Sequence, residues 1–147
     1  GDNNWKYRRD AVIALMNDRQ PDLFGIQEGL FYQVNFIEKN LPDYGRYGAG
    51  HEGNDASGEA NAIFWRKDRY SPVECGTFWL SETPGTESLG WDAAYKRVVV
   101  WGHFLDNEAD GRDVYFFNTH FDHIGKKARK EEGKLIVGKI KEIVPEI

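Results

Sequence analysis

The sequence predicts an α/β protein, and three patterns indicate this class. Residues from about 4 to 18 have the apolar face of a helix, residues 23–27 form a short apolar run, and residues from about 30 to 40 again have helical spacing. Later segments alternate apolar and polar side chains, which predicts strands. These strand candidates are residues 44–49, 60–66, 72–79, 96–105 and 113–119. Helices and strands in short succession are typical of an α/β fold.

Residues that typically start or end helices lie at the boundaries of the first three predicted elements, which are a helix, a strand and a second helix. Asn3 or Asn4 can cap the first helix. Pro21 breaks it, and the apolar run that follows ends at Gln27 and Glu28. In the second helix the apolar side chains fall on one side. They are Phe31, Val34, Ile37 and Leu41.

Turn-rich segments separate the strands of the second half. They lie at residues 48–58, 81–90 and 106–113, and they imply that neighbouring strands are antiparallel. A closing helix from Lys126 to about Ile143 is charged, with a solvated basic face. Its apolar face is formed by Leu135, Ile136, Ile140 and Ile143.

Length and charge restrict the function classes. A chain of 147 residues is long enough for a single domain but too short for two independent ones. The net charge of -5 leaves no global positive field for duplex DNA, so any phosphate chemistry must depend on a local site. No apolar run is long enough to span a bilayer. We expect a soluble protein, and the start at Gly1 without methionine leaves cytoplasm and export both open.

Two strand ends carry polar residues that suit phosphate chemistry. Glu28 follows the buried strand 23–27, and a carboxylate there can bind a hard cation such as Mg²⁺, although a surface or helix-capping glutamate is an alternative. The run Asn118-Thr119-His120-Phe121-Asp122-His123 follows the strand at 114–117. Its histidines can act as general acids or as donors to a phosphoryl oxygen, or they are ordinary loop histidines. A metal cluster of both histidines with Asp122 is a further alternative.

Glu59 and Arg97 are the other candidates. Glu59 opens a strand, and its carboxylate would orient His120 if the two side chains meet across neighbouring strands. Arg97 also begins a buried strand, and its guanidinium is suited to bidentate phosphate binding. Each has an ordinary alternative, as a strand-end carboxylate and a surface arginine.

Read in order, these elements resemble the endonuclease/exonuclease/phosphatase superfamily. The matching stretches are residues 4–9, 21–28, 58–65, 77–84 and 118–123. The resemblance is to bacterial members, and it implies a metal-dependent phosphodiesterase, nuclease or phosphatase that uses Mg²⁺ or Mn²⁺. It implies Glu28 as the metal ligand and His120, paired with Glu59, as catalytic residues. Arg97, Asn118 and His123 would then contact or support the phosphate of a phosphoester substrate.

The resemblance also implies a four-layer α/β sandwich, with two mixed sheets packed face to face and helices outside. Relatives begin with a strand that ends in asparagine, and they close with Gly-Asp-Phe-Asn and Ser-Asp-His motifs; neither feature is found within residues 1–147. We therefore expect one incomplete domain that is inactive alone. Its uncovered sheet edge and apolar face would favour association with a second copy or with a missing C-terminal half. A non-catalytic phosphate-binding or association module is the alternative. The loops at 48–58 and 81–90 are expected to select the leaving group.

Overall fold

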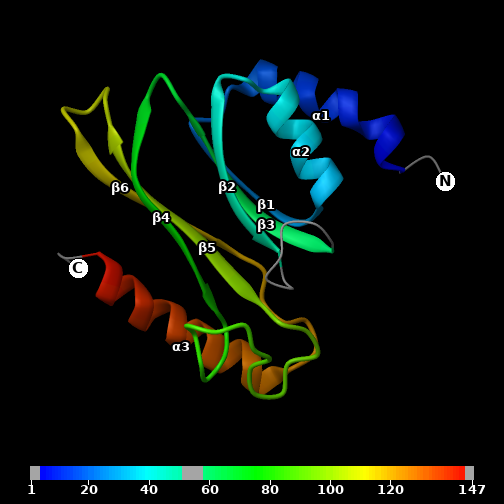
Figure 1. The fold of residues 1–147 in the computed structure, drawn as a ribbon, viewed down its shortest axis with the longest axis vertical. Helices are drawn as coiled ribbons and strands as arrows, with labels where there is room; N and C mark the ends of the chain where they lie inside the picture. Colours follow the sequence, from blue (N-terminus) through cyan, green and yellow to red (C-terminus); the bar gives the residue numbers. More distant parts are fainter. Residues whose placement is uncertain (1–3, 51–57, 145–147) are drawn as a thin grey trace.

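The computed structural model describes residues 4–50 and 58–144. Within these residues three helices and six strands follow one another (Figure 1). The helices are α1 (Trp5–Arg19), α2 (Phe31–Asn40) and α3 (Lys126–Ile143). The strands are β1 (Leu23–Leu30), β2 (Tyr44–Gly50), β3 (Glu59–Arg66), β4 (Tyr70–Trp79), β5 (Val98–Asp106) and β6 (Arg112–Thr119). Each predicted element is present, and most bounds agree within a few residues.

The helix ends follow from local side chains. The side chain of Asn4 caps α1 by accepting from the backbone N–H of Lys6 at 3.2 Å; Asn3, the other predicted cap, lies outside the described residues. The N-cap residue of α3 is Gly125, which has no side chain to cap the helix. Asp92 supplies the cap instead, because its carboxylate accepts from the backbone N–H of Ala128 at 2.6 Å. This contact joins the segment before β5 to the start of α3.

The strands form two three-stranded sheets. Their orders are β1-β3-β2 and β4-β5-β6, so β3 and β5 are the central strands. Every pairing between described strands is antiparallel, so the mixed character expected of these sheets is not seen in the described residues. Antiparallel order has a consequence for the site: β1 and β6 end at the edge where β3 and β5 begin.

The elements stack in four layers, which confirms the predicted sandwich (Figure 1). The inner faces of the two sheets enclose one apolar core, formed by Ile63, Trp65, Tyr70, Val100 and Phe104. Helices α1 and α2 pack on the outer face of the first sheet, and α3 packs on the outer face of the second. Because each sheet is covered on both faces, its central strand is almost fully buried.

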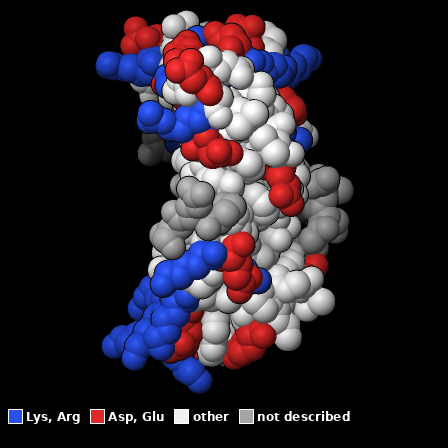
Figure 2. Space-filling view, turned by 90° about the vertical axis from the view of Figure 1, so that its left-hand side faces the viewer, with Lys and Arg blue, Asp and Glu red and all other residues white. Residues whose placement is uncertain are grey.

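Charged side chains distribute unevenly over the surface. In Figure 2, Lys and Arg gather on the lower part of the molecule, where α3 lies, whereas both signs are mixed on the upper part. The helix α3 contains seven basic residues. Two of them form ion pairs along the helix, Lys134 with Glu131 at 2.8 Å and Lys139 with Glu142 at 2.6 Å. The predicted basic, solvated face of this helix is therefore present.

Candidate functional site

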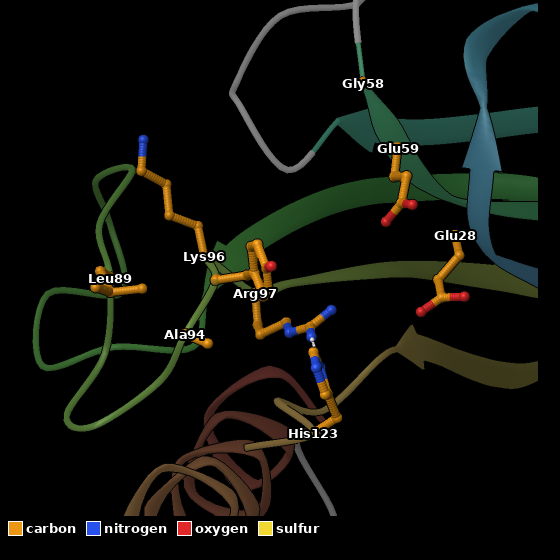
Figure 3. A pocket seen from close by; sticks show the side chains of 9 residues that line it. Glu28, Gly58, Glu59, Leu89, Ala94, Lys96, Arg97 and His123 are labelled. Atoms are coloured by element: carbon orange, nitrogen blue, oxygen red, sulfur yellow. Dashed lines mark hydrogen bonds between the residues drawn. The ribbon is translucent and has the colours of Figure 1, made fainter. Parts of the chain in front are cut away.

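A pocket of ≈ 660 Å³ opens at the edge where β1 and β6 end and β3 and β5 begin (Figure 3). One wall is the first sheet, and the other is the segment that leads from β4 into β5. The pocket is lined by Glu28, Gly58, Glu59, Leu89, Ala94, Tyr95, Lys96, Arg97 and His123. Four of the six residues selected from the sequence are in this lining: Glu28, Glu59, Arg97 and His123.

Glu28 is placed by a β-bulge. The pairing of β1 with β3 shifts register between Ile26 and Gly29, so Gln27 and Glu28 leave the regular ladder. Glu28 has a backbone φ of 54°, in the left-handed region that few residues other than glycine adopt. The strand predicted to end at Gln27 therefore continues to Leu30, with the acidic residue inside the bulge. Bulges of this kind are common next to active sites, where they redirect a side chain.

Arg97 is a buried cation held by two histidines. It is only 4% exposed. Its Nη1 lies 2.8 Å from Nδ1 of His120, its Nη2 lies 3.2 Å from Nδ1 of His123, and Oδ1 of Asp122 is 3.6 Å from Nη2. A guanidinium can only donate hydrogen bonds, so both Nδ1 atoms must accept. In this arrangement each histidine carries its proton on Nε2.

His120 connects Arg97 to Glu28. Its Nε2 lies 3.2 Å from Oε1 of Glu28, so a continuous chain of polar contacts runs from the buried guanidinium to the half-exposed carboxylate. This differs from the expected pairing with Glu59. Glu59 is exposed and lines the same pocket, yet among the described residues it makes no hydrogen bond or ion pair with His120. The bulge brings Glu28 to the imidazole instead.

Asn118 ties the two sheets together. It is 5% exposed, and its Nδ2 donates to the backbone carbonyls of Ile26 at 2.8 Å and Ala62 at 2.9 Å. Its Oδ1 accepts a hydrogen bond from the side chain of Gln27. Both donors are therefore committed to β1 and β3, and the amide supports the site by fixing the start of the bulge. The expected contact with a phosphate remains a prediction.

Sequence comparison identifies the family. The model of the Endonuclease/Exonuclease/phosphatase family matches residues 1–137. The chain belongs to this family. A family member from Bacteroides vulgatus is 39% identical, with a TM-score of 0.92 over 99% of this chain and 56% of that chain. The mannosyl-6-phosphatase of Bacteroides thetaiotaomicron is 42% identical, with a TM-score of 0.92 over 97% of this chain and 53% of that one. An uncharacterised protein of Acanthamoeba polyphaga mimivirus is 27% identical over 133 residues, or 86% of this chain and 49% of that protein.

The chain thus spans about half the length of these relatives, and it fits the N-terminal portion of the family's domain. The family is a superfamily of hydrolases that act on phosphoesters. No helix within residues 4–50 and 58–144 is long and apolar enough to cross a membrane. The predicted leaving-group loop at 48–58 lies mostly outside the described residues, since 51–57 are not described.

Asp122 has a supporting position that the sequence did not indicate. It is fully buried, and its carboxylate accepts backbone hydrogen bonds from two loops. The donors are Ala94 at 3.2 Å, Tyr95 at 3.4 Å, Ile124 at 3.0 Å and Gly125 at 2.7 Å. Burial alone would raise the pKa of Asp122, but these hydrogen bonds lower it to about 2. Because its oxygens are occupied, Asp122 does not suit the alternative of a metal cluster with the histidines.

Tyr95 is one of the pocket residues that the sequence patterns missed. Its ring stacks on that of His123, with centroids 5.8 Å apart and an angle of 18° between planes. One signal was available: Tyr95 and Arg97 are two positions apart before a strand, and side chains at this spacing share one side of an extended chain. A further signal exists for Asp122, since an aspartate shortly before Gly125 and a helix is typical of a side-chain-capped turn.

Proposed function

We propose that the full-length protein is a phosphoester hydrolase that uses Mg²⁺ or Mn²⁺, with the pocket around Arg97 as its phosphate site. One observation carries the proposal: the buried guanidinium of Arg97, the imidazole of His120 and the carboxylate of Glu28 form one connected chain at the pocket. A fixed cation beside an imidazole N–H donor and an exposed carboxylate is a combination suited to a phosphoryl group with a bound divalent cation.

Glu28 fits the role of metal ligand. Its side chain is 57% exposed, and only Oε1 contacts His120, which leaves Oε2 for a cation. Mg²⁺ commonly binds through one or two carboxylates together with water and substrate phosphate. Among the described residues no group of three or more acidic, histidine or cysteine side chains could hold an ion. Glu28 would therefore be the main ligand that this chain supplies, and the bound cation would polarise the phosphoryl oxygens.

The cationic and imidazole groups would stabilise the charge that develops on the phosphoryl oxygens. Arg97 is fixed by His120 and His123, so its orientation costs little reorganisation during the reaction. The proton that His120 carries on Nε2 can be donated to a phosphoryl oxygen. Glu59 projects into the pocket from β3 beside Glu28 (Figure 3), and it is proposed to assist His120 once substrate is bound.

A sugar phosphate is the proposed substrate class. The relative that is 42% identical is described as a mannosyl-6-phosphatase, and the similarity covers 97% of this chain. The net charge of -5 disfavours nucleic acid as substrate, since its phosphate backbone is polyanionic. A small phosphomonoester carries fewer charges and needs only the local cations of the pocket. We therefore favour a phosphatase over a nuclease.

Residues 1–147 alone are proposed to have negligible activity. The family's Gly-Asp-Phe-Asn and Ser-Asp-His motifs do not occur in them after His120, and the second supplies the general base. General-base assistance is worth about 10²- to 10⁴-fold in rate. The full-length protein should exceed residues 1–147 by at least the lower of these factors in the same assay.

Hydrolysis of mannose 6-phosphate and of bis-nitrophenyl phosphate by the full-length protein tests the proposal. We expect release of inorganic phosphate from the monoester, loss of turnover with chelator, and recovery with Mg²⁺ or Mn²⁺. Glu28→Gln should lower kcat roughly 100-fold or more, because it removes the anionic metal ligand. Glu38→Gln, on the exposed side of α2, is the control. Turnover that survives both chelator and Glu28→Gln would exclude the role of Glu28, and phosphate binding without any turnover would favour a binding module.

A further inference from the structure

The pocket extends beyond the phosphate site into an apolar region. Its volume of ≈ 660 Å³ is that of a small-molecule site, and a phosphoryl group would occupy only a fraction of it. Past Arg97 and its neighbour Lys96, the wall includes Leu89, Ala94 and Tyr95, and we name these three residues the ring shelf. Tyr95 is 60% exposed and Leu89 is 51% exposed. Large apolar side chains grouped on a pocket wall indicate a place where a ligand covers them.

Tyr95 is held in place without a ligand. Its backbone N–H donates to Oδ1 of the buried Asp122 at 3.4 Å, and its ring stacks on His123. The guanidinium carbon of Arg97 lies 5.8 Å from the centroid of the same ring. An exposed aromatic ring fixed from behind loses little freedom when a ligand covers it, so its surface is available for binding at low entropic cost. The same residues thus fix the position of the ring shelf relative to the phosphate site.

The opposite wall of the pocket is polar. Glu59 is exposed, and in Figure 3 its carboxylate projects from β3 across the pocket from Leu89 and Ala94. A pyranose ring has this same division, since its C–H groups form an apolar face and its hydroxyl groups form a polar rim. C–H groups pack on an aromatic face, and a carboxylate accepts from hydroxyl groups. A flat nucleobase would use the ring shelf but would not need the carboxylate.

We propose that the ring shelf binds the pyranose ring of a sugar phosphate whose phosphoryl group lies at Arg97, and that Tyr95 is the residue that determines this specificity. The inference rests on the proposed function for the phosphate site, and it adds the residues that recognise the leaving group. Loss of the Tyr95 ring should therefore reduce discrimination between a hexose phosphate and a small acyclic phosphate more than it reduces phosphate binding.

The test compares two substrates in the full-length protein, mannose 6-phosphate and glycerol phosphate, by release of inorganic phosphate. Tyr95→Ala should lower the ratio of their kcat/KM values roughly tenfold, chiefly through KM for the hexose. Tyr95→Phe keeps the aromatic face and should keep the ratio. Tyr32→Ala is the matched control, because Tyr32 is 58% exposed on α2 and does not line the pocket. Calorimetric titration with mannose 6-phosphate and with inorganic phosphate repeats the comparison without turnover.

The outcomes separate this inference from the proposed function. Equal losses for both substrates in Tyr95→Ala would show that Tyr95 only supports His123 and Arg97, and would overturn the ring shelf. A preference for a nucleoside 5′-monophosphate over mannose 6-phosphate would also overturn it. If wild type hydrolyses neither phosphate, the proposed function fails. The ring shelf then stands only if titration shows that mannose 6-phosphate binds more tightly than inorganic phosphate and that Tyr95→Ala removes the difference.

Discussion

Arg97 shows how a charged side chain can be buried at the start of a strand. Removing a guanidinium from water is costly unless acceptors pair with it. Here two imidazoles accept from the two Nη atoms and Asp122 balances the charge, while the buried Nε has no hydrogen-bond partner among the described residues. The sequence indicated Arg97, His120 and His123 separately, because Arg97 precedes an apolar run and the two histidines follow another. It did not indicate that the three side chains meet, since the contact joins positions 23 and 26 residues apart.

Asp122 gives a prediction at the residue scale. In the folded protein its pKa is about 2, below the ordinary 3.8. A depressed pKa means that the ionised carboxylate stabilises the fold above about pH 4, and that this contribution is lost as the pH falls towards 2. Asp122→Asn should therefore cost about 2 kcal/mol in the free energy of unfolding at pH 7.

Urea unfolding of wild type and Asp122→Asn across pH 2 to 7 measures this effect. The difference between the two proteins should shrink steadily below about pH 4. Asp10→Asn is the control, because Asp10 is 82% exposed on α1, and it should stay within about 0.5 kcal/mol of wild type. A difference for Asp122→Asn that does not change with pH would mean that folding does not lower the pKa of this carboxyl.

The bulge in β1 is the feature at the element scale that the sequence could not predict. The spacing of apolar residues, together with the turn residues, predicted every helix and strand, because the core needs apolar side chains on defined faces. The apolar run ends at Gln27, so the strand was expected to end there too, yet the backbone continues to pair at Gly29 and Leu30. A positive φ can be predicted from the sequence where glycine or asparagine occurs, but a glutamate at such a position gives no local signal.

Backbone strain at Glu28 leads to a second prediction. Glu28→Ala and Glu28→Gly both remove the carboxylate, but only glycine adopts a φ of 54° without strain. The glycine variant should therefore be more stable than the alanine variant by about 1 kcal/mol, although glycine normally weakens a strand. Thermal unfolding of the two variants measures the difference. Greater stability of the alanine variant would show that the bulge relaxes to a negative φ.

The close packing of Gly25 in β1 against Asn118 leads to a third prediction. A Cβ placed on Gly25 would lie 2.6 Å from Oδ1 of Asn118, so the side chain that joins the sheets would have to move. Gly25→Ala should cost about 1–3 kcal/mol in the free energy of unfolding, as overpacking usually does. Gly133→Ala is the control, because that glycine lies in α3 with open space around it. Gly133→Ala should stabilise the helix by about 0.5–1 kcal/mol. Equal effects of the two substitutions on the denaturation midpoint would contradict the predicted clash with Asn118.

At the scale of the whole molecule, the antiparallel order of both sheets places the site. Four strand ends from two sheets meet at one edge, and contacts across the core hold the sheets together there. The sequence predicted the four layers through a family resemblance rather than through its periodicity, because alternation shows which face of a strand is buried but not which strands pair. For the same reason, the sequence led us to expect Glu59 as the partner of His120, whereas the structure places Glu28 there.

The binding of inorganic phosphate to the full-length protein, with and without Mg²⁺, tests most directly whether Glu28 and His120 share one site for a cation and a phosphoryl group. Two ligands in contact must affect each other's affinity. We predict that Mg²⁺ raises the affinity for phosphate by about fivefold or more in wild type, and that Glu28→Gln abolishes the increase. An affinity that is the same with and without Mg²⁺, in both wild type and Glu28→Gln, would contradict the shared site.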